Sequence, residues 1–330
     1  MYEDLLTNKN IKKQLPGILR FLIKLFQIIL YIPIQIIFIP FAVIGLIDAI
    51  YKEVGKSKKL GVSFTAIKAL QYRWIMHYFN TRPDPLSVEF TKKFPCESHF
   101  GLWSTLGALI ISQRLFGFTT GLGKVDEPGE ETLYSCPGSR VLMFDRIMEK
   151  YVDEMEQIVL PGAGFDLIAL HFTKGKKVKV FELDQVNTLN AKVETLKKAG
   201  IKHDWITYVP VDYAHESWVD KLLDAGFDKS KKTLFLWQSV SLYLEAEIVK
   251  ETLQAMADLC ADGSVIAQDL YSKAYSLGEY SVIAKRNMNL IESMGEPAKF
   301  GIDMSDDPKA AVESFLKECG LKMTNYIQFG

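Results

Sequence analysis

The chain has 330 residues, of which 48% are apolar and 24% charged, which is enough for one large or two ordinary domains and excludes a disordered chain. Its 39 lysines and arginines nearly balance 40 aspartates and glutamates, so no nucleic-acid partner is expected. Its 4 cysteines form no C-x-x-C pair and N-x-S/T sites are absent, which favours a reducing compartment.

Residues 25–47 form an uncharged, apolar segment of membrane length. As a helix rising about 1.5 Å per residue it would extend roughly 34 Å, against about 30 Å of hydrocarbon. A signal peptide fits less well, because no small-x-small cleavage site follows. A buried or pocket-covering helix of a soluble protein is the other alternative. We expect residues 25–47 to contact membrane lipid, with the remainder of the chain membrane-associated and facing the cytoplasm.

The arrangement of this segment in a bilayer is left open by the sequence. Pro33 and Pro40 are expected to interrupt the helix, and both flanks are basic. A single span places one basic cluster on the wrong side, whereas a re-entrant or interfacial element keeps both on the cytoplasmic face. The basic residues before the segment are Lys9, Lys12, Lys13, Arg20 and Lys24, and those after it are Lys52, Lys56, Lys58 and Lys59.

Changes in composition predict three parts of the chain. Residues 1–59 are basic and hydrophobic, and we expect them to associate with a membrane. Residues 60–139 are aromatic-rich and are predicted to form a helical cap and substrate region, with a helix over 102–118. The glycines and prolines of 119–139 predict a loop, and a ligand-binding domain is expected over 140–330.

Strand and helix patterns alternate in the last part of the chain. This alternation predicts an α/β fold with a doubly wound, mostly parallel sheet. A sixth strand is expected over 321–329, at the end of the given sequence, so that either the sheet is a short one or the sequence is incomplete. The other predicted strands are 157–160, 177–183, 206–211, 233–240 and 264–270, and the clearest helices are 187–199 and 245–261.

The turn after the first strand is expected to bind a ligand, because doubly wound sheets bind ligands at the carboxyl ends of their strands. Gly162 and Gly164 allow close approach of the backbone, and Asp184 follows at the end of the second strand, where it can accept hydrogen bonds from both ribose hydroxyls. Glu182 is the neighbouring alternative. Leu167 replaces the third glycine of a dinucleotide fingerprint, and no P-loop is present. A nucleoside without phosphates remains, which suggests S-adenosylmethionine.

Several short segments between residues 66 and 270 match a known family in order. Together they resemble the leucine carboxyl methyltransferase family, which also includes bacterial O-methyltransferases. The matching segments are Arg82-Pro83-Asp84-Pro85-Leu86, Arg140 with Phe144-Asp145, Gln157 to Gly164 with Asp166, Phe181 to Gln185, Lys192, Ala225 to Asp228, and Leu242-Tyr243-Leu244.

This resemblance implies a class I methyltransferase (Rossmann-like) fold that binds S-adenosyl-L-methionine. Arg140 would hold the methionine carboxylate of the cofactor, which suits a planar guanidinium. Gly162 and Gly164 would pass beneath the methionine and ribose, and Asp184 would bind the ribose diol. Arg73 is the candidate for an upstream basic residue that contributes to the same site.

The resemblance extends to the ends of the third and fourth strands. Asp212 and Tyr213 would lie at the adenine, and Gln238 takes the place where the family has a glutamate near the cofactor amino group. Three family charges are lost, at Leu142, at Leu167-Ile168 and at Gln238. These losses predict weaker cofactor binding or a rebuilt substrate pocket. No metal is expected, because the histidines and cysteines lack ligand spacing.

The leading hypothesis is a membrane-associated, S-adenosyl-L-methionine-dependent O-methyltransferase. Its acceptor would be a small molecule, lipophilic if the segment 25–47 holds the cap at a membrane, in a pocket that includes Tyr72, Trp74, Tyr78 and Phe79. A carboxylate acceptor is ionised at neutral pH and needs no base, and the sequence identifies no catalytic residue. The alternatives are methylation of a protein C-terminal leucine carboxylate and a membrane-tethered, non-catalytic cofactor-binding protein.

Overall fold

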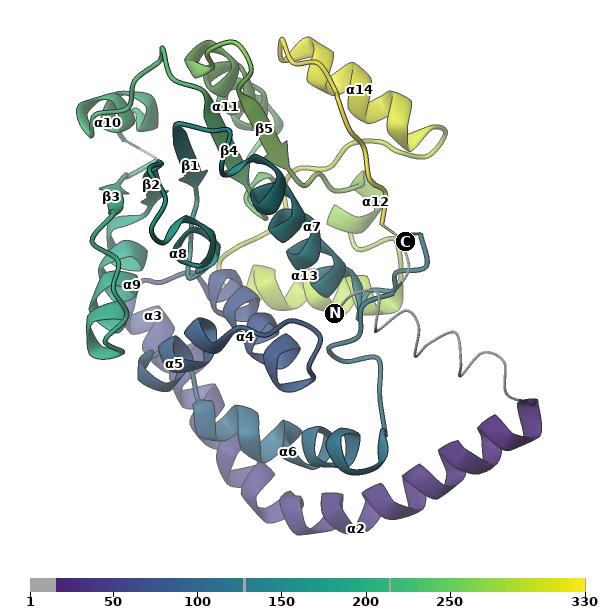
Figure 1. Ribbon diagram of the computed structural model, residues 1–330. Coiled ribbons are helices and arrows are strands. Elements are labelled where there is room, and N and C mark those ends of the chain that lie inside the picture. The colour runs from purple at the N-terminus through teal and green to yellow at the C-terminus, as the bar shows by residue number, and fades with distance from the viewer. Residues whose placement is uncertain (1–15, 127–128, 214, 330) are drawn as a thin grey trace. The chain divides into compact units, whose positions relative to one another are not determined.

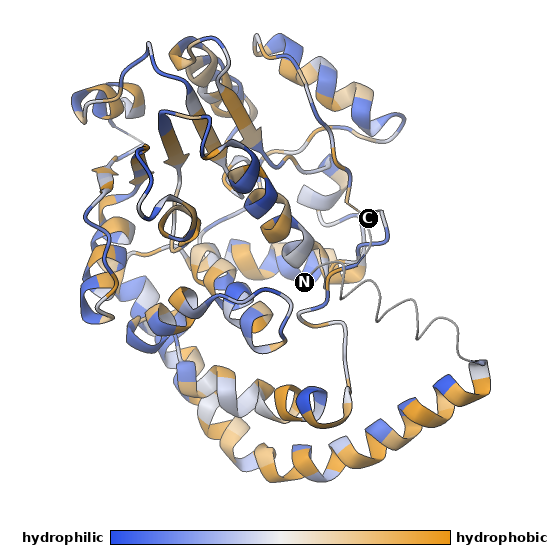
Figure 2. Cartoon of the chain, in the orientation of Figure 1, coloured by the Kyte–Doolittle hydropathy of each residue, from blue (hydrophilic) through white to orange (hydrophobic). Residues whose placement is uncertain are grey.

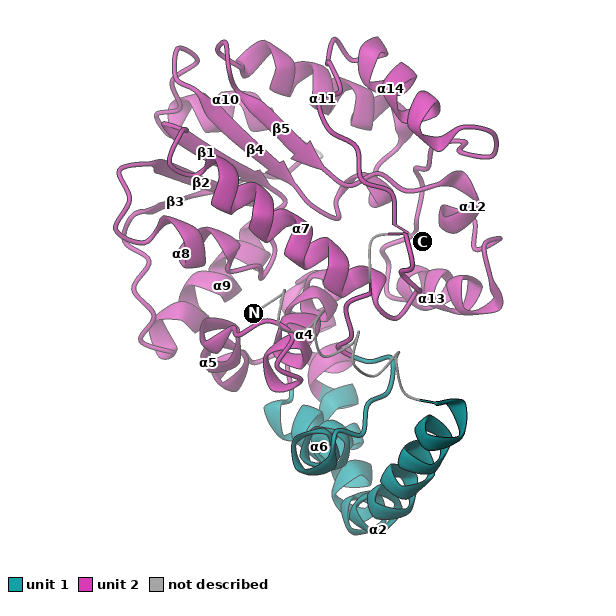
Figure 3. Ribbon diagram, turned by 45° about the vertical axis from the view of Figure 1, so that its right-hand side comes forward, with its two compact units in different colours: residues 1–51, 98–122 teal, residues 52–97, 123–330 magenta. Residues whose placement is uncertain are grey.

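The computed structural model describes residues 16–126, 129–213 and 215–329 (Figure 1). Lys9, Lys12 and Lys13 lie outside the described residues. The chain divides into two compact units, which Figure 3 colours separately. We call residues 1–51 with 98–122 the hairpin unit, and residues 52–97 with 123–330 the sheet unit. The division into 1–59, 60–139 and 140–330 stays a prediction.

The sheet unit contains five parallel strands in the order β3-β2-β1-β4-β5 within its described residues. Because β1 has β2 on one side and β4 on the other, the strand order reverses at β1, as a doubly wound sheet requires. The predicted α/β sheet is confirmed. Its strands are β1 Gln157–Pro161, β2 Lys179–Asp184, β3 Ile206–Pro210, β4 Thr233–Trp237 and β5 Val265–Gln268.

Each face of the sheet packs against its own helices. In β4, Leu234 and Leu236 enter one apolar cluster, and Phe235 and Trp237 enter the other, because successive side chains point to opposite faces. Both faces are covered, which explains why the central strands are apolar runs without polar alternation. The first cluster includes side chains of α7 (Cys136–Tyr151), α8 (Ile168–Thr173) and α9 (Val186–Lys198), and the second those of α10 (Trp218–Asp224), α11 (Ala246–Leu259) and α14 (Pro308–Glu318) (Figure 3).

The helices that precede the sheet begin at recognisable capping residues. Ser63 Oγ accepts the N–H of Ala66 at the start of α4 (Phe64–Tyr78), and Asp84 accepts that of Ser87 at the start of α5 (Pro85–Lys93). The remaining elements of this unit are a π-helical turn Tyr51–Lys56, α3 (Ser57–Leu60), a 3₁₀ turn Ser241–Tyr243, α12 (Lys273–Ser276) and α13 (Val282–Ser293).

The described residues of the hairpin unit form two helices packed along each other, α2 (Gly17–Ile50) and α6 (His99–Phe116) (Figure 3). Small residues allow the close packing, because a Cβ on Gly45 would lie 1.8 Å from Ser104 Oγ. Gln27 Nε2 donates to Phe116 O at 2.8 Å, and Ser98 Oγ donates to Asp48. Since Gln27 meets the end of α6 and Asp48 meets its start, the two helices are antiparallel.

Figure 2 shows that α2 is apolar along most of its length, and most of its large apolar side chains are exposed. Among the described residues, one helical segment, Gly17–Leu60, is both long enough and apolar enough to cross a membrane. The expected interruption at Pro33 and Pro40 is wrong, since both prolines lie inside α2, which curves in Figure 1 but stays helical. A helix interior tolerates a proline when neighbouring contacts offset the lost hydrogen bond.

Two further expectations about secondary structure are corrected. Helix α7 begins at Cys136, inside the predicted loop, because Pro137 lies in the first turn, where its missing N–H removes no helical hydrogen bond. Residues 321–329 are not a strand. Instead, Leu321, Met323 and Tyr326 pack as partly buried side chains against the second cluster, so their hydrophobicity reflects packing rather than sheet pairing.

Candidate functional site

The predicted site residues gather at one edge of the sheet. Each strand is parallel to its neighbours, so all five carboxyl ends lie at the same edge, and the predicted residues occupy the ends of four of them. They are Gly162 and Gly164 after β1, Glu182 and Asp184 in β2, Asp212 and Tyr213 after β3, and Gln238 after β4.

The turn after β1 requires both of its glycines. Gly162 and Gly164 have φ values of +71° and +49°, in the left-handed region that disfavours other residues. A Cβ on Gly162 would lie 2.5 Å from Val240 Cγ2, and one on Gly164 would lie 3.1 Å from Ala66 Cβ. The turn therefore needs glycine both for its conformation and for its close contacts.

Asp184 links the glycine turn to the end of β2. Its Oδ2 accepts the N–H of Gly164 at 2.7 Å, and its Oδ1 accepts that of Gln185 at 2.7 Å. Burial raises the pKa of the Asp184 carboxyl, and the two backbone donors oppose this shift. The carboxylate has about four lone-pair sites, more than these two donors occupy, so it keeps acceptor capacity for a ligand hydroxyl.

Tyr213 lies against the same turn, whereas the Asp212 carboxylate turns toward solvent. The residue Tyr213 is 43% exposed as a whole, but burial of its hydroxyl raises the pKa of this group. The Asp184 charge adds to this shift, and a backbone hydrogen bond with Gly162 opposes it. Asp212 Oδ2 lies 2.9 Å from His215 Nδ1, and the Asp212 N–H donates to Glu216. Tyr213 thus joins the site near Asp184, and the Asp212 side chain contacts its own turn.

Glu182 is buried in the protein and paired with a lysine. It is fully buried and lies 2.6 Å from Lys192 Nζ, which is also fully buried. Burial raises the pKa of Glu182, and the Lys192 charge opposes the shift. Lys192 Nζ also donates to the backbone oxygen of Asp166 at 2.6 Å. Of the two carboxylates in β2, Asp184 is therefore the one still accessible to a ligand.

Arg73 reaches the glycine turn through Asp166, which follows Gly164 by two residues. Arg73 Nη2 donates to Asp166 Oδ2 at 2.6 Å, and its Nη1 lies 3.7 Å from Asp84. Arg82 also contacts Asp84, and its Nη2 donates to Asp145 at 3.0 Å. Burial alone would raise the pKa of Asp84, but Arg82 and Arg73 lower it overall. A buried ionic network thus connects α4, α5 and α7 to the turn.

Arg140 lies beside the ends of β4 and β5. Its Nη1 donates to Tyr271 Oη at 2.7 Å and lies 3.5 Å from Asp269 Oδ2. Asp269 Oδ1 accepts the N–H of Ser239 at 2.7 Å, and Ser239 has a φ of +59°. Asp269 therefore fixes an unfavourable backbone conformation directly after Gln238, which is half-buried.

Asp269 and Tyr271 were not predicted as site residues. The predicted strand extended to residue 270, which placed Asp269 inside it, whereas β5 ends at Gln268 and leaves Asp269 at the carboxyl edge. A carboxylate at the end of an apolar strand is the signal that could have indicated it. Two aromatic residues proposed for an acceptor pocket, Trp74 and Phe79, are 0% and 5% exposed and belong to the core.

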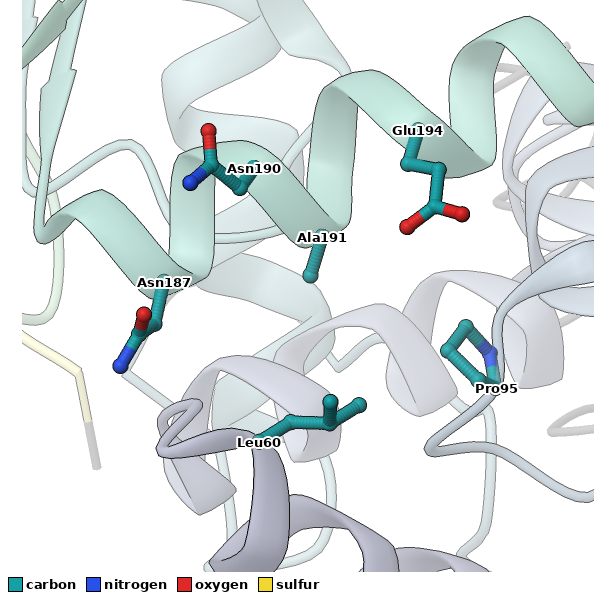
Figure 4. Close-up of a pocket in the computed structure, with 6 residues that line it drawn as sticks. All are labelled: Leu60, Pro95, Asn187, Asn190, Ala191 and Glu194. Carbon is teal, nitrogen blue, oxygen red and sulfur yellow. The ribbon is translucent and has the colours of Figure 1, made fainter.

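A shallow pocket of about 150 Å³ lies elsewhere in the sheet unit (Figure 4). None of the predicted site residues lines it. Its lining residues are Leu60, Pro95, Asn187, Asn190, Ala191 and Glu194. In the part of the chain that the structure describes, no group of three or more histidine, cysteine, aspartate or glutamate side chains could hold a metal ion.

The fold and the site together indicate a class of protein. A doubly wound parallel sheet with a glycine turn after β1 and a carboxylate at the end of β2 is the arrangement of nucleoside-binding α/β proteins. Residues 115–257 match the family model described as leucine carboxyl methyltransferase. This match confirms the family resemblance found in the sequence.

Curated relatives agree with the family match. A protein of Mycobacteroides abscessus named "Putative S-adenosyl-L-methionine-dependent methyltransferase" is 26% identical over 188 residues, covering 56% of this chain and 60% of the relative. A protein of the same name from Mycolicibacterium paratuberculosis is 28% identical over 189 residues, with the same shares. The chain thus spans less than two thirds of the length of these relatives.

Solved structures give only distant likenesses. The mitomycin 7-O-methyltransferase MmcR is 12% identical, with a TM-score of 0.41 over 60% of this chain and 52% of that chain. A score this low does not bear on the activity.

Proposed function

We propose that this chain is an S-adenosyl-L-methionine-dependent O-methyltransferase that methylates a carboxylate or hydroxyl group of a small, lipophilic acceptor at a membrane. The observation that carries the proposal is the contact between Asp184 Oδ2 and the Gly164 N–H, at the edge where the strand order reverses. The match of residues 115–257 to leucine carboxyl methyltransferase and the names of the curated relatives support the reaction class.

The residues present suit this cofactor. Asp184 retains lone pairs for a ribose diol, and Tyr213 lies next to Asp184, where a ring can pack on adenine. Arg140 Nε is buried and has no hydrogen-bond partner among the described atoms, so it is a donor available for a carboxylate. Arg73 would act on the same site through Asp166.

The loss of a family glutamate at Gln238 is offset nearby. Asp269, whose side chain is 9% exposed, places a carboxylate next to Ser239 and so close to Gln238, and it shares its charge with Arg140, whose Nη1 lies 3.5 Å from Asp269 Oδ2. A negative charge here favours an ammonium group. This carboxylate supports the enzyme over the non-catalytic binding protein, an alternative that rests on the charges lost at Leu142 and Gln238.

The chemistry needs little from the protein beyond alignment. The cofactor supplies a methyl group on a sulfonium, which is already a good leaving group. The protein binds and orients the acceptor and excludes water, and such positioning contributes most of the rate. A carboxylate acceptor is ionised at neutral pH and needs no base. A hydroxyl acceptor needs one, and we assign no catalytic base.

The apolar helix α2 supports a lipophilic acceptor. Its large exposed side chains, such as Phe26, Ile37 and Ile47, suit contact with lipid. An enzyme whose anchor rests in lipid meets acceptors that partition there, with the sheet unit in the cytoplasm. Methylation of a protein C-terminal leucine, the activity that names the family model, is the second candidate.

Calorimetry tests the cofactor site directly. Wild-type protein should bind S-adenosylmethionine and S-adenosylhomocysteine, and Asp184→Asn should weaken both by at least about tenfold, roughly 1.4 kcal/mol, because the amide loses charge and half of its acceptor capacity. The matched control is Asp224→Asn, an exposed carboxylate at the end of α10, which should bind as wild type does. No binding by folded wild-type protein refutes the proposal.

The acceptor is tested next, in the presence of vesicles. Lipophilic carboxylic acids, lipophilic alcohols and peptides ending in leucine are each offered with radiolabelled cofactor. Methyl transfer to the lipophilic compounds supports the acceptor class proposed here. Transfer only to the peptides favours the second candidate, and transfer only to polar, soluble acids contradicts the membrane context.

A further inference from the structure

The exposed apolar surface of α2 is too large to face water. Twenty of its residues are large, apolar and exposed, from Ile18 at 72% to Leu30 at 36%, and of its 34 residues, all described, only Gly45 is buried. Soluble monomers rarely expose a contiguous apolar patch larger than a few hundred Å². Packing on α6 leaves most of these apolar side chains exposed.

The uncharged polar side chains of α2 and its one carboxylate form hydrogen bonds inside the hairpin unit. Gln27 donates to Phe116 O at 2.8 Å, Gln35 accepts from Tyr31 Oη, and Asp48 accepts from Ser98. A lipid environment demands such internal pairing, because hydrocarbon offers no hydrogen bonds to an amide or a carboxylate. A helix facing water would gain little from it. The pairing therefore favours lipid as the cover.

Basic residues stand at both ends of the apolar stretch. Arg20 and Lys24 precede it, and Arg114 lies in the last turn of α6, the end that Gln27 contacts. Lys52, Lys56, Lys58 and Lys59 follow α2. Positive charge at both ends complements the anionic headgroups of one membrane face, since each basic residue near such a surface adds to binding.

The connections of α6 argue against a joint crossing of the bilayer by α2 and α6. At its start, Ser98 is bonded directly to Glu97 of the sheet unit, and at its end only residues 117–122 separate it from the sheet unit at Gly123. Seven extended steps from Phe116 to Gly123 cover at most about 25 Å, less than about 30 Å of hydrocarbon. If α2 and α6 crossed the bilayer together, this connection could not return to the face that carries the sheet unit.

We propose that the hairpin unit is an in-plane membrane anchor, in which α2 and α6 lie along one face of an anionic bilayer with both ends of α2 on that face. The apolar side chains of residues 25–47 enter the acyl boundary, and the basic ends contact headgroups. The inference deepens the membrane context of the proposed function and is independent of the cofactor site.

Vesicle binding tests the charge requirement. Full-length protein should sediment with vesicles of phosphatidylcholine and phosphatidylglycerol, and at least about tenfold less with phosphatidylcholine alone, with salt weakening binding to the anionic vesicles. Arg20→Glu with Lys24→Glu should reduce binding at least about tenfold. Lys309→Glu, at an exposed position of α14, is the control and should change it little. Equal binding to both vesicle types overturns the charge argument.

Thiol labelling tests the arrangement. Arg20→Cys, Ile36→Cys and Lys59→Cys are made one at a time after Cys136 and Cys260 are replaced by serine, and a membrane-impermeant maleimide is added outside preformed anionic vesicles. The proposal expects labelling at positions 20 and 59 without detergent, and at position 36 only with detergent. Protection at position 20 indicates a span and overturns the proposal. Free labelling at position 36 shows that lipid does not cover α2.

Failure of this inference and failure of the proposed function give different results. If the hairpin unit does not bind vesicles, or self-associates instead, calorimetric binding of S-adenosylmethionine is unaffected. If Asp184→Asn binds the cofactor as wild type does, the labelling pattern is unaffected.

Discussion

Similar apolar sequences are buried in the sheet unit and exposed in the hairpin unit. Every residue of β4 is buried, with helices on both faces of the sheet, whereas twenty large apolar residues of α2 are exposed. Both segments are apolar without regular polar alternation. The difference lies in their partners: β4 has strands and helices around it, whereas among the described residues of its unit α2 has α6 alone. Hydrophobicity thus shows that a segment avoids water, and its packing shows what replaces the water.

The largest expected effect on stability comes from comparing substitutions at two phenylalanines, one in each unit. Phe235 in β4 is 0% exposed and Phe41 in α2 is 53% exposed. Phe235→Ala should lower the free energy of unfolding by about 3–5 kcal/mol, because it leaves a cavity. Phe41→Ala should lower it by no more than about 0.5 kcal/mol in the absence of lipid. Urea denaturation measures both, and a large loss from Phe41→Ala would show that protein, rather than lipid, covers α2.

A smaller effect compares two glycines within the sheet unit. Gly162 and Gly175 both have positive φ, +71° and +78°, but a Cβ on Gly162 meets Val240 and one on Gly175 meets nothing within 4 Å. Gly175→Ala should cost about 1–2 kcal/mol from backbone strain alone. Gly162→Ala should cost about 1–3 kcal/mol more, from overpacking, and should weaken cofactor binding. Equal costs would mean that the turn shifts freely away from Val240.

The smallest expected effect is the change in stability at acid pH. The described helices of the hairpin unit hold one carboxylate, Asp48, so acid should act mainly on the sheet unit. Its Asp84 has a lowered pKa, so it contributes stability above its ordinary value of 3.8 that is lost as the pH falls further. Asp184 has a raised pKa, so its contribution falls as the pH rises above 3.8.

Unfolding measured across this range separates the two carboxyl groups. Compared with wild type, Asp84→Asn should lose stability at neutral pH but show a weaker decline toward acid. Asp184→Asn should lack the decline that its carboxyl causes as the pH rises. Identical pH profiles for wild type and Asp84→Asn would show that Arg73 and Arg82 do not stabilise the ionised form.

Much of the sheet could be predicted, because strand and helix periodicity reflect local burial. The five strands begin within two residues of the predicted positions, and the glycine turn with Asp184 lies at the expected edge. The predicted sixth strand failed, because apolar residues such as Met323 pack in a similar way with or without a strand partner. Periodicity measures burial and does not identify the partner.

The site was only partly predictable for a related reason. Residues that end strands could be named from the sequence, but the partners of Arg73 and Arg140 could not. Asp166 and Asp269 come from segments distant in sequence, and side-chain pairing across a fold leaves no local pattern. The roles assigned to the cofactor-binding residues stay predictions until binding is measured.

The hairpin unit is discontinuous in the chain, and this order has a consequence during synthesis. Helix α2 is complete at Ile50, but its partner α6 is not complete until Phe116. At about 5–20 residues per second, α2 emerges from the ribosome several seconds before α6 exists to pack on it. In that interval the most apolar segment of the nascent chain is accessible to chaperones, targeting factors or lipid. Any of these can therefore bind the chain while the ribosome is still translating it, before the sheet has been made.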